Sequence, residues 1–209
     1  MYKSLLIVDD FYSNPMEVRR AALSADYPAV TGVRTFPGRN SAQPFTVPGL
    51  DQVASQLANE PITGDTANAN SFHSHFRITV GGEVGRYNVH ADPSHLAMVG
   101  ICYLTLPEHC QGGTTFFRHR QTGTDRTPRQ EDLEAAGYAS VAELLQRDGK
   151  DTERWETLMT IPMRFNRLVL YRPFFWHSAG PAFGDSPENG RLIQLFSFVR
   201  GAAQQRQSA

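Results

Sequence analysis

The stretch NGRLIQLFSFV, residues 189–199, has the alternating pattern of a β-strand with two different faces. Side chains two apart on a strand point to the same side. One face therefore carries Arg191, Ile193, Leu195 and Ser197, and the other carries Leu192, Gln194, Phe196 and Phe198. A strand that is apolar on both faces lies between two layers, which is typical of a β-sandwich or a barrel.

Further runs of this kind recur along the chain between turn signals, and they set the expected fold. These runs of β-branched and aromatic residues span 72–80, 99–106, 114–118 and 167–172. Such spacing predicts a mainly β protein with flanking helices (α+β), built on a double-stranded β-helix, or jelly-roll, core. An N-terminal strand and a helix opened by Asn14 and Pro15 precede the core, and residues 121–160 form a charged, helix-prone insertion that we interpret as a lid or flank.

Length and composition limit the classes of protein. The 209 residues fit one domain, residues 1–209, and a formal net charge of −1 gives no reason to expect nucleic acid or an anionic membrane as a partner. The start MYKSLLIVDDF resembles neither a secretory signal nor a membrane span, so we expect a cytoplasmic protein. Cys102 and Cys110 make a poor disulfide framework and lack the spacing of a thiolate zinc site, so any metal would be bound by imidazole and carboxylate groups.

The segment RYNVHADPSH, residues 86–95, carries the first candidate ligands. His90 and Asp92 share a face with Asn88 alongside, whereas Tyr87 alternates to the other side. His177 follows the strand pattern at 167–172 and stands among aromatic residues. A 2-His-1-carboxylate site for non-haem iron needs one close pair and one distant histidine. Two polar residues on a solvent face and a satisfied core histidine are the alternatives.

A different histidine cluster is also conceivable. FHSHF places His73 and His75 on one predicted strand face, and His95 lies three residues beyond Asp92. A set of His75, His90 and His95 would need the Pro93–Ser94 loop to return His95 to the strand. We therefore favour the set of His90, Asp92 and His177.

Five motifs that occur in a fixed order resemble those of a known family. They are YNVHAD, CYL, GGTTFF, FFWHSA and GRLIQLF, between about residue 85 and residue 199. Together they resemble the iron(II)- and 2-oxoglutarate-dependent oxygenases, and most closely the prolyl-hydroxylase-like branch. The resemblance covers more than half of the chain.

The resemblance implies roles for individual residues. His90, Asp92 and His177 would bind Fe(II), while Arg191 and the hydroxyl of Tyr103 would bind the C5 carboxylate of 2-oxoglutarate. The counterpart of Tyr87 lies near the substrate in the family, although a core tyrosine is an equal alternative. Asn88 and Trp176 are further substrate candidates, Asn88 beside the metal pair and Trp176 as a wall of the pocket.

The implied reaction uses Fe(II), 2-oxoglutarate and O2 to hydroxylate an unactivated C–H bond. The substrate would be an amino acid, a peptide side chain or a small metabolite. A cupin-like metal enzyme without 2-oxoglutarate would use the same core, but no glutamate follows HAD at the expected distance. A non-catalytic jelly-roll binding module is the other alternative.

Two departures from the family pattern concern the cosubstrate. Arg191 lies 14 residues beyond His177, a longer gap than is common in the branch, and FGDSPENG fills it as a loop. If that loop displaces Arg191, then Arg172 or Arg200 would be the anchor, and an ion pair of Arg191 with Asp185 or Glu188 is the structural alternative. The second departure is Ile193, which stands where the branch usually has a small hydroxyl residue.

Overall fold

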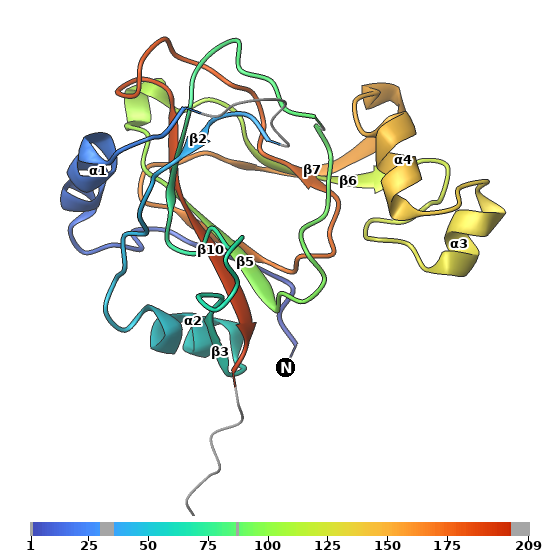
Figure 1. The fold of residues 1–209 in the computed structure, drawn as a ribbon, viewed down its shortest axis with the longest axis horizontal. Coiled ribbons are helices and arrows are strands. Elements are labelled where there is room, and N and C mark those ends of the chain that lie inside the picture. Colours follow the sequence, from blue (N-terminus) through green and yellow to red (C-terminus); the bar gives the residue numbers. More distant parts are fainter. Residues whose placement is uncertain (1, 30–35, 87, 202–209) are drawn as a thin grey trace, which may run out of the picture.

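Residues 2–29, 36–86 and 88–201 are described by the computed structural model (Figure 1). In chain order the strands and α-helices are β1 (Leu5–Val8), α1 (Pro15–Ser24), β2 (Arg39–Asn40), α2 (Leu50–Ala58), β3 (Ile62–Gly64), β4 (Phe76–Thr79), β5 (Met98–Tyr103), β6 (Gly113–His119), α3 (Gln130–Ala135), α4 (Val141–Asp148), β7 (Trp155–Pro162), β8 (Leu168–Tyr171), β9 (His177–Ser178) and β10 (Arg191–Arg200). Short 3-10 helices span Pro107–His109 and Thr152–Arg154. This part of the chain is mostly β with few helices, as the sequence predicts.

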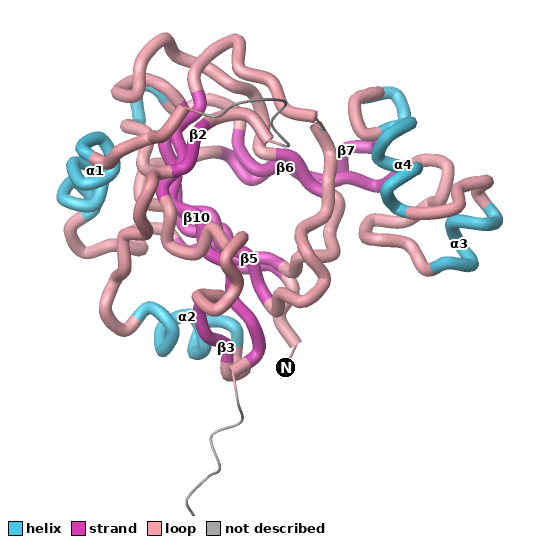
Figure 2. The backbone as a smooth tube through the Cα atoms, viewed as in Figure 1, coloured by secondary structure: helices cyan, strands magenta, loops and turns pink. Residues whose placement is uncertain are grey.

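Two antiparallel sheets form the core of the molecule (Figure 2). In the larger one the order is β1-β8-β5-β10-β4-β2, with β3 also paired to β10, and in the smaller one it is β7-β6-β9. Isolated bridges, such as that between His90 and His177, extend the smaller sheet. The fold is a double-stranded β-helix, which confirms the predicted fold class.

Strand β10 has the two faces that its sequence predicts. Leu192, Phe196 and Phe198 pack with residues of α1 and α2 in one apolar cluster. Ile193 belongs to a second cluster, which fills the space between the sheets. Burial of such a side chain contributes roughly 1.5–3 kcal/mol to folding. Helices α1 and α2 therefore cover the outer face of the larger sheet, and its inner face points toward the smaller sheet (Figure 1).

Helices α3 and α4 lie within the segment 121–160, on the far side of β6 and β7 from α1 (Figure 1). Leu133 and Leu144 pack there against Trp155 and Trp176 in a third apolar cluster. The helices thus have a core of their own against the smaller sheet.

One predicted strand begins later than its sequence suggests. In FHSHF the backbone turns, because the amide of His75 donates to the carbonyl of Phe72 and Ser74 adopts a φ of 63°. Strand β4 consequently starts at Phe76. His73 and His75 do not share a strand face, and their Nδ1 atoms lie 2.7 Å from the carbonyl oxygens of Ser197 and Ser41, respectively.

Candidate metal centre and anion site

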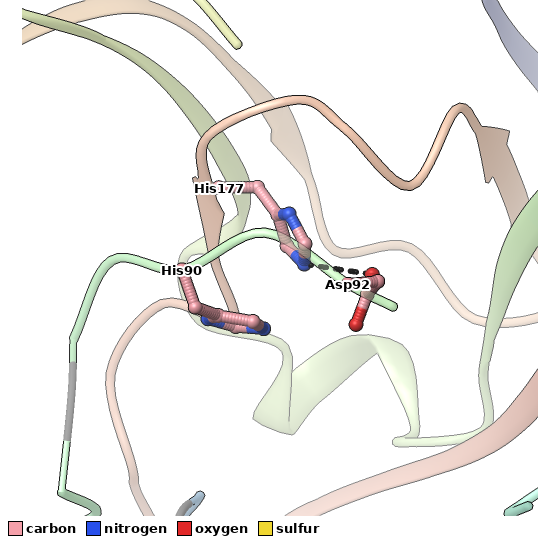
Figure 3. A group of neighbouring side chains, drawn as sticks. All are labelled: His90, Asp92 and His177. Carbon is pink, nitrogen blue, oxygen red and sulfur yellow. Dashed lines mark ion pairs between the residues drawn. The ribbon is translucent and has the colours of Figure 1, made fainter. Parts of the chain in front are cut away.

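His90, Asp92 and His177 come together at the inner end of the smaller sheet (Figure 3). His90 and His177 exchange backbone hydrogen bonds of 3.0 and 2.9 Å, and the amide of Asp92 donates to the carbonyl of Pro173 at 2.8 Å. One ligand atom from each residue lies within 4.8 Å of the other two. The HAD segment is held by these few bonds and not by a continuous strand.

The side chain of His177 is oriented for a cation. Its Nδ1 lies 2.9 Å from the carbonyl oxygen of Phe175, which only accepts, so Nδ1 carries the proton and Nε2 presents a lone pair. That Nε2 lies 3.3 Å from Oδ2 of Asp92. In the neutral ring two electron-pair donors therefore face each other. A cation bound by both would relieve this contact.

Tyr171 supplies a hydroxyl beside the same two atoms. Its hydroxyl lies 3.0 Å from Nε2 of His177 and 3.4 Å from Oδ2 of Asp92. Burial and the nearby Asp92 carboxylate raise the pKa of Tyr171 well above its usual value, so the hydroxyl stays a proton donor. Its single proton can go to either atom, and a cation bound at Nε2 of His177 would leave it for the Asp92 carboxylate.

Burial disfavours charge at this centre. It raises the pKa of the Asp92 carboxyl, and together with the nearby His177 and Arg77 it lowers the pKa of the His90 imidazole well below its usual value. A neutral imidazole is the form that binds a metal, and a divalent cation would stabilise the buried carboxylate. Within the described residues, no other group of three His, Cys, Asp or Glu side chains is close enough to share a metal ion. The alternative set of His75, His90 and His95 is thus not assembled.

A cavity of about 100 Å³ opens from this centre along the inner face of β10. Arg191 lines it and is only 3% exposed. Neither Nε nor Nη2 of Arg191 has a hydrogen-bond partner among the residues that the structure describes. A buried guanidinium with unsatisfied donors is costly, and a bound carboxylate would satisfy them. Neither Asp185 nor Glu188 forms the alternative ion pair.

Tyr103 interacts electrostatically with Arg191 but does not line the cavity. The Tyr103 hydroxyl makes a 2.7 Å hydrogen bond with Oγ1 of Thr114, in the GGTTFF motif. Gly113, at the start of β6, allows β7 to approach closely, because a Cβ there would overlap the carbonyl oxygen of Ile161. Ile193 lies opposite Tyr103 in the β5–β10 register. The Tyr103 hydroxyl thus has a partner within the protein, and Ile193 adds no polar group of its own.

The two rival arginines have other surroundings. Arg172 forms an ion pair with Glu60 and donates to the carbonyls of Lys3 and Ala97, at 2.8 and 3.0 Å. Arg200 is exposed at the end of β10. Neither lines the cavity, so Arg191 is the arginine at the candidate centre.

The three substrate candidates lie in different places. Asn88 is exposed and lines an outer cavity of about 410 Å³, which shares His90 and Phe36 with the inner one. Trp176, expected as a pocket wall, is instead fully buried against Trp155 in the cluster beneath α3 and α4, because it alternates to the opposite side from His177. Tyr87 lies outside the described residues.

Sequence reasoning missed two polar side chains of the cavity. Arg77, on β4, lines it together with Arg191, and Tyr171 contacts two of the three candidate ligands. A signal for Arg77 was present in the sequence, since it alternates with the apolar Phe76 and Ile78 and so must face the other way. Tyr171 gave no such signal, because its strand is apolar on both faces.

Three solved structures share the fold over nearly the whole chain. The non-heme alpha-ketoglutarate-dependent carbocyclase SnoK from nogalamycin biosynthesis is 13% identical, with a TM-score of 0.55, and the match covers 95% of this chain and 80% of SnoK. The epimerase SnoN from the same biosynthesis is 13% identical, with a TM-score of 0.54 and coverages of 94% and 78%. HygX from Streptomyces hygroscopicus, solved with nickel, 2-oxoglutarate and hygromycin B, is 12% identical, with a TM-score of 0.54 and coverages of 94% and 83%.

These identities establish a common fold. SnoK and SnoN are described as alpha-ketoglutarate dependent, and HygX was solved with 2-oxoglutarate bound. No curated protein matches the sequence. In the described ranges, no helix has the length and apolarity needed to cross a membrane. A family model matches residues 2–197, and the chain therefore belongs to the family of unknown function DUF6445.

Proposed function

We propose that this protein is a non-haem iron(II)- and 2-oxoglutarate-dependent dioxygenase. The observation that carries the proposal is the cavity that joins two imidazoles and one carboxylate to a buried guanidinium, two of whose nitrogens have no hydrogen-bond partner among the described residues. The first set is the donor set of a facial iron site, and the second is a receptor for a carboxylate. The motif order, which resembles the prolyl-hydroxylase-like branch, and the shared fold support the same function.

In this function each residue has one task. His90, Asp92 and His177 would bind Fe(II), with the Phe175 carbonyl holding the His177 ring and the Tyr171 hydroxyl donating to Asp92. When bound, Fe(II) and 2-oxoglutarate with O2 supply the oxidant for an unactivated C–H bond.

Arg191 would hold the distal carboxylate of 2-oxoglutarate through two charge-assisted hydrogen bonds. Tyr103 and Thr114, beside it, would orient that end of the cosubstrate. Val99, Ile101 and Leu195 line the cavity and would exclude water from the reacting carbon. The outer cavity, with Asn88, is the candidate approach for a small-molecule or peptide substrate.

The proposal is tested by the conversion of 2-oxoglutarate to succinate, measured by mass spectrometry without added substrate. We expect succinate only when ferrous iron, 2-oxoglutarate and O2 are all present. His177→Ala should abolish it, whereas His75→Ala, outside the cluster, should retain it. Iron binding without consumption of 2-oxoglutarate would favour a cupin-like enzyme, and no iron binding would favour a non-catalytic module.

A further inference from the structure

Arg77 is a second cation in the candidate cavity. It lies on β4 directly opposite Ile193 of β10, while its neighbours Phe76 and Ile78 pack in the cluster beneath the helices. Its side chain lines the cavity that also contains the three candidate ligands and Arg191. Two strands thus each direct one guanidinium at the same small volume.

The surroundings of Arg77 fix its side chain and leave part of it free. Nε donates to Oδ1 of Asn40 at 2.6 Å. The guanidinium carbon lies 5.5 Å from the ring centroid of Phe36 and 5.7 Å from that of Phe72. Phe36 in turn lies 4.3 Å, centroid to centroid, from the ring of His90. Two aromatic rings thus accompany the cation, and among the described residues only its Nε has a hydrogen-bond acceptor.

Among the residues that the structure describes, no carboxylate lies within 4.0 Å of Arg77, and the hydrogen-bond partner of its Nε is the neutral amide of Asn40. Burial, with the nearby Arg191, lowers its pKa to about 10, so it still carries its charge at neutral pH. Asp92 also acts on it electrostatically, but Asp92 belongs to the candidate metal set.

The charges of the cavity leave one positive charge without a partner. Among the described residues its lining contains two arginines, Arg77 and Arg191, and one carboxylate, Asp92, while the histidines are neutral as metal ligands. Ferrous iron and the 2-oxoglutarate dianion cancel each other, so the excess persists in the loaded site. A buried excess charge is costly, and a monoanion would remove it.

We propose that Arg77 binds the carboxylate of the substrate, which makes the substrate a small carboxylic acid anion with its reacting C–H bond near the candidate metal centre. This inference rests on the proposed function. Arg191 is the deeper of the two arginines, at 3% exposure, whereas Arg77 stands beside Phe72, which is 43% exposed. The cosubstrate therefore binds Arg191, and the substrate, which enters last, binds Arg77.

The experiment uses protein loaded with manganese(II) in place of iron, together with 2-oxoglutarate, so that no turnover occurs. The probes are monocarboxylates from acetate to octanoate, with benzoate and phenylacetate, each paired with its carboxamide. Binding is measured by water-proton relaxation of the bound manganese and by ligand-observed NMR. We expect the carboxylates to bind about tenfold or more tightly than their amides, as one charge-assisted pair predicts.

Arg77→Gln should abolish the preference for carboxylates and leave manganese and 2-oxoglutarate affinity within about threefold of wild type, less than the loss of a charge-assisted pair. Arg77→Lys, which keeps the charge without the planar pair of donors, should retain part of the preference. Arg39→Gln is the matched control, because Arg39 on β2 lies opposite Ile78, on the other face of the sheet, and should bind as wild type does.

The outcomes separate the two proposals. Equal binding of acids and amides, or no binding of any carboxylate, by protein that does bind manganese and 2-oxoglutarate would overturn the role of Arg77. So would an Arg77→Gln variant that loses 2-oxoglutarate as strongly as Arg191→Gln, since Arg77 would then bind the cosubstrate. A wild-type protein that binds neither manganese nor 2-oxoglutarate would refute the proposed function itself, and this inference with it.

Discussion

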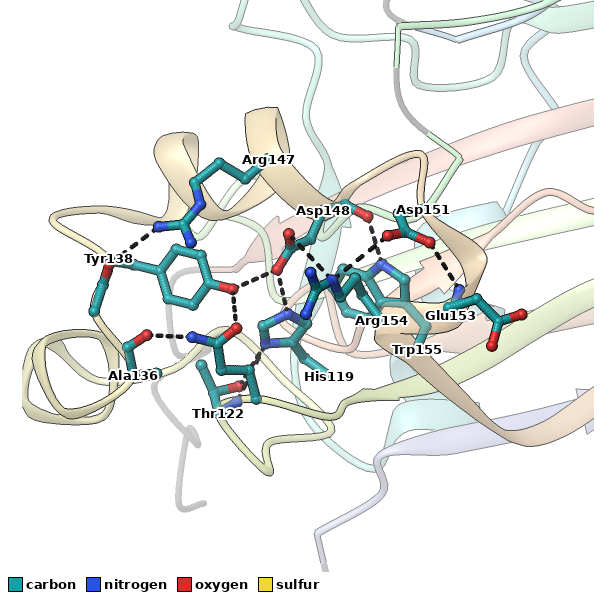
Figure 4. Close-up of polar contacts among 12 residues, drawn as sticks. His119, Thr122, Ala136, Tyr138, Arg147, Asp148, Asp151, Glu153, Arg154 and Trp155 are labelled. Carbon is teal, nitrogen blue, oxygen red and sulfur yellow. Dashed lines mark hydrogen bonds and ion pairs between the residues drawn. The ribbon is translucent and has the colours of Figure 1, made fainter.

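Among the described residues, two histidine–aspartate pairs have a buried imidazole, and they differ in the hydrogen bonds that their nitrogens make. In the pair beneath α4, Asp148 accepts from Nε2 of His119 at 2.9 Å and from the Tyr138 hydroxyl (Figure 4). The other nitrogen of His119 lies 3.0 Å from the Thr122 hydroxyl. In the cavity pair, His177 and Asp92 oppose lone pairs at 3.3 Å.

The hydrogen bonding of the two clusters indicates different roles. The His119 cluster, with Trp155 donating to the backbone of Asp148 at 2.9 Å, meets its hydrogen-bonding needs within the protein and joins α4 to the end of β6. In the cavity cluster, two nitrogens of Arg191, Nε and Nη2, have no partner among the described residues, so they are available to a ligand. The same residue types thus stabilise the fold in one place and form a candidate binding site in the other.

The largest effect is expected for His177→Ala. Loss of one of three candidate ligands should lower the affinity for Mn(II) by more than the roughly 10–100-fold that removing an outer-shell partner costs. Anaerobic calorimetric titration measures this. His119→Ala is the control, and it should bind Mn(II) as wild type does. Equal loss in both variants would erase the distinction between the clusters.

Arg191→Met should weaken 2-oxoglutarate binding about a hundredfold, because two charge-assisted hydrogen bonds are lost. The ligand-free variant should unfold at the same urea concentration as wild type or a higher one, since a buried charge without a partner has been removed. Arg200→Met, at the exposed end of the same strand, is the matched control for charge. Marked destabilisation of the ligand-free Arg191 variant would indicate that Arg191 has a structural partner.

Asp148→Ala should destabilise the protein and leave 2-oxoglutarate binding unchanged. The buried Nε2–H of His119 loses its acceptor, and the Tyr138 hydroxyl loses one of two, since Oε1 of Gln121 remains at 2.9 Å; the free energy of unfolding should fall by about 2 kcal/mol. Urea denaturation measures this loss. The affinity for 2-oxoglutarate should stay within about twofold of wild type, because no contact of the cavity has changed. A stable variant with impaired 2-oxoglutarate binding would contradict the assignment.

The smallest effect concerns pH. Burial lowers the pKa of His119 below its usual 6.5, so the unfolded chain binds a proton where the folded protein does not. Stability should therefore fall as the pH drops below about 6.5, until the folded protein also takes up the proton. His73 and His90 contribute shifts of the same sign, so His119→Gln should make the slope shallower without removing it. Urea midpoints between pH 7.5 and 5 would show this, and an unchanged slope would contradict it.

The strands could be predicted because short-range pattern encodes them. His90, Asp92 and His177 are selected by motifs in a fixed order, and the structure brings the three side chains together. The alternation of residues 191–198 fixes two faces, and that prediction agrees with the packing of β10. The same rule, applied to FFWHSA, would have placed Trp176 away from His177, as the structure does. The substrate role expected for Trp176 neglected this alternation.

The remaining features depend on contacts between residues that are distant in sequence. Asp148 lies 29 residues beyond its partner His119, and Asn40 lies 37 residues before Arg77. No periodicity in the sequence signals either pair. The turn that delays β4 likewise depends on Ser74 adopting a positive φ, which its residue type does not require.

The central claim is that the cavity binds ferrous iron and 2-oxoglutarate together. The most direct measurement is an anaerobic titration of the protein with ferrous iron and then 2-oxoglutarate, which follows the weak visible charge-transfer band. We expect a band that requires both additions, is absent in His177→Ala and needs more 2-oxoglutarate in Arg191→Met. Wild-type protein that gives no band and leaves the iron unbound would contradict the claim.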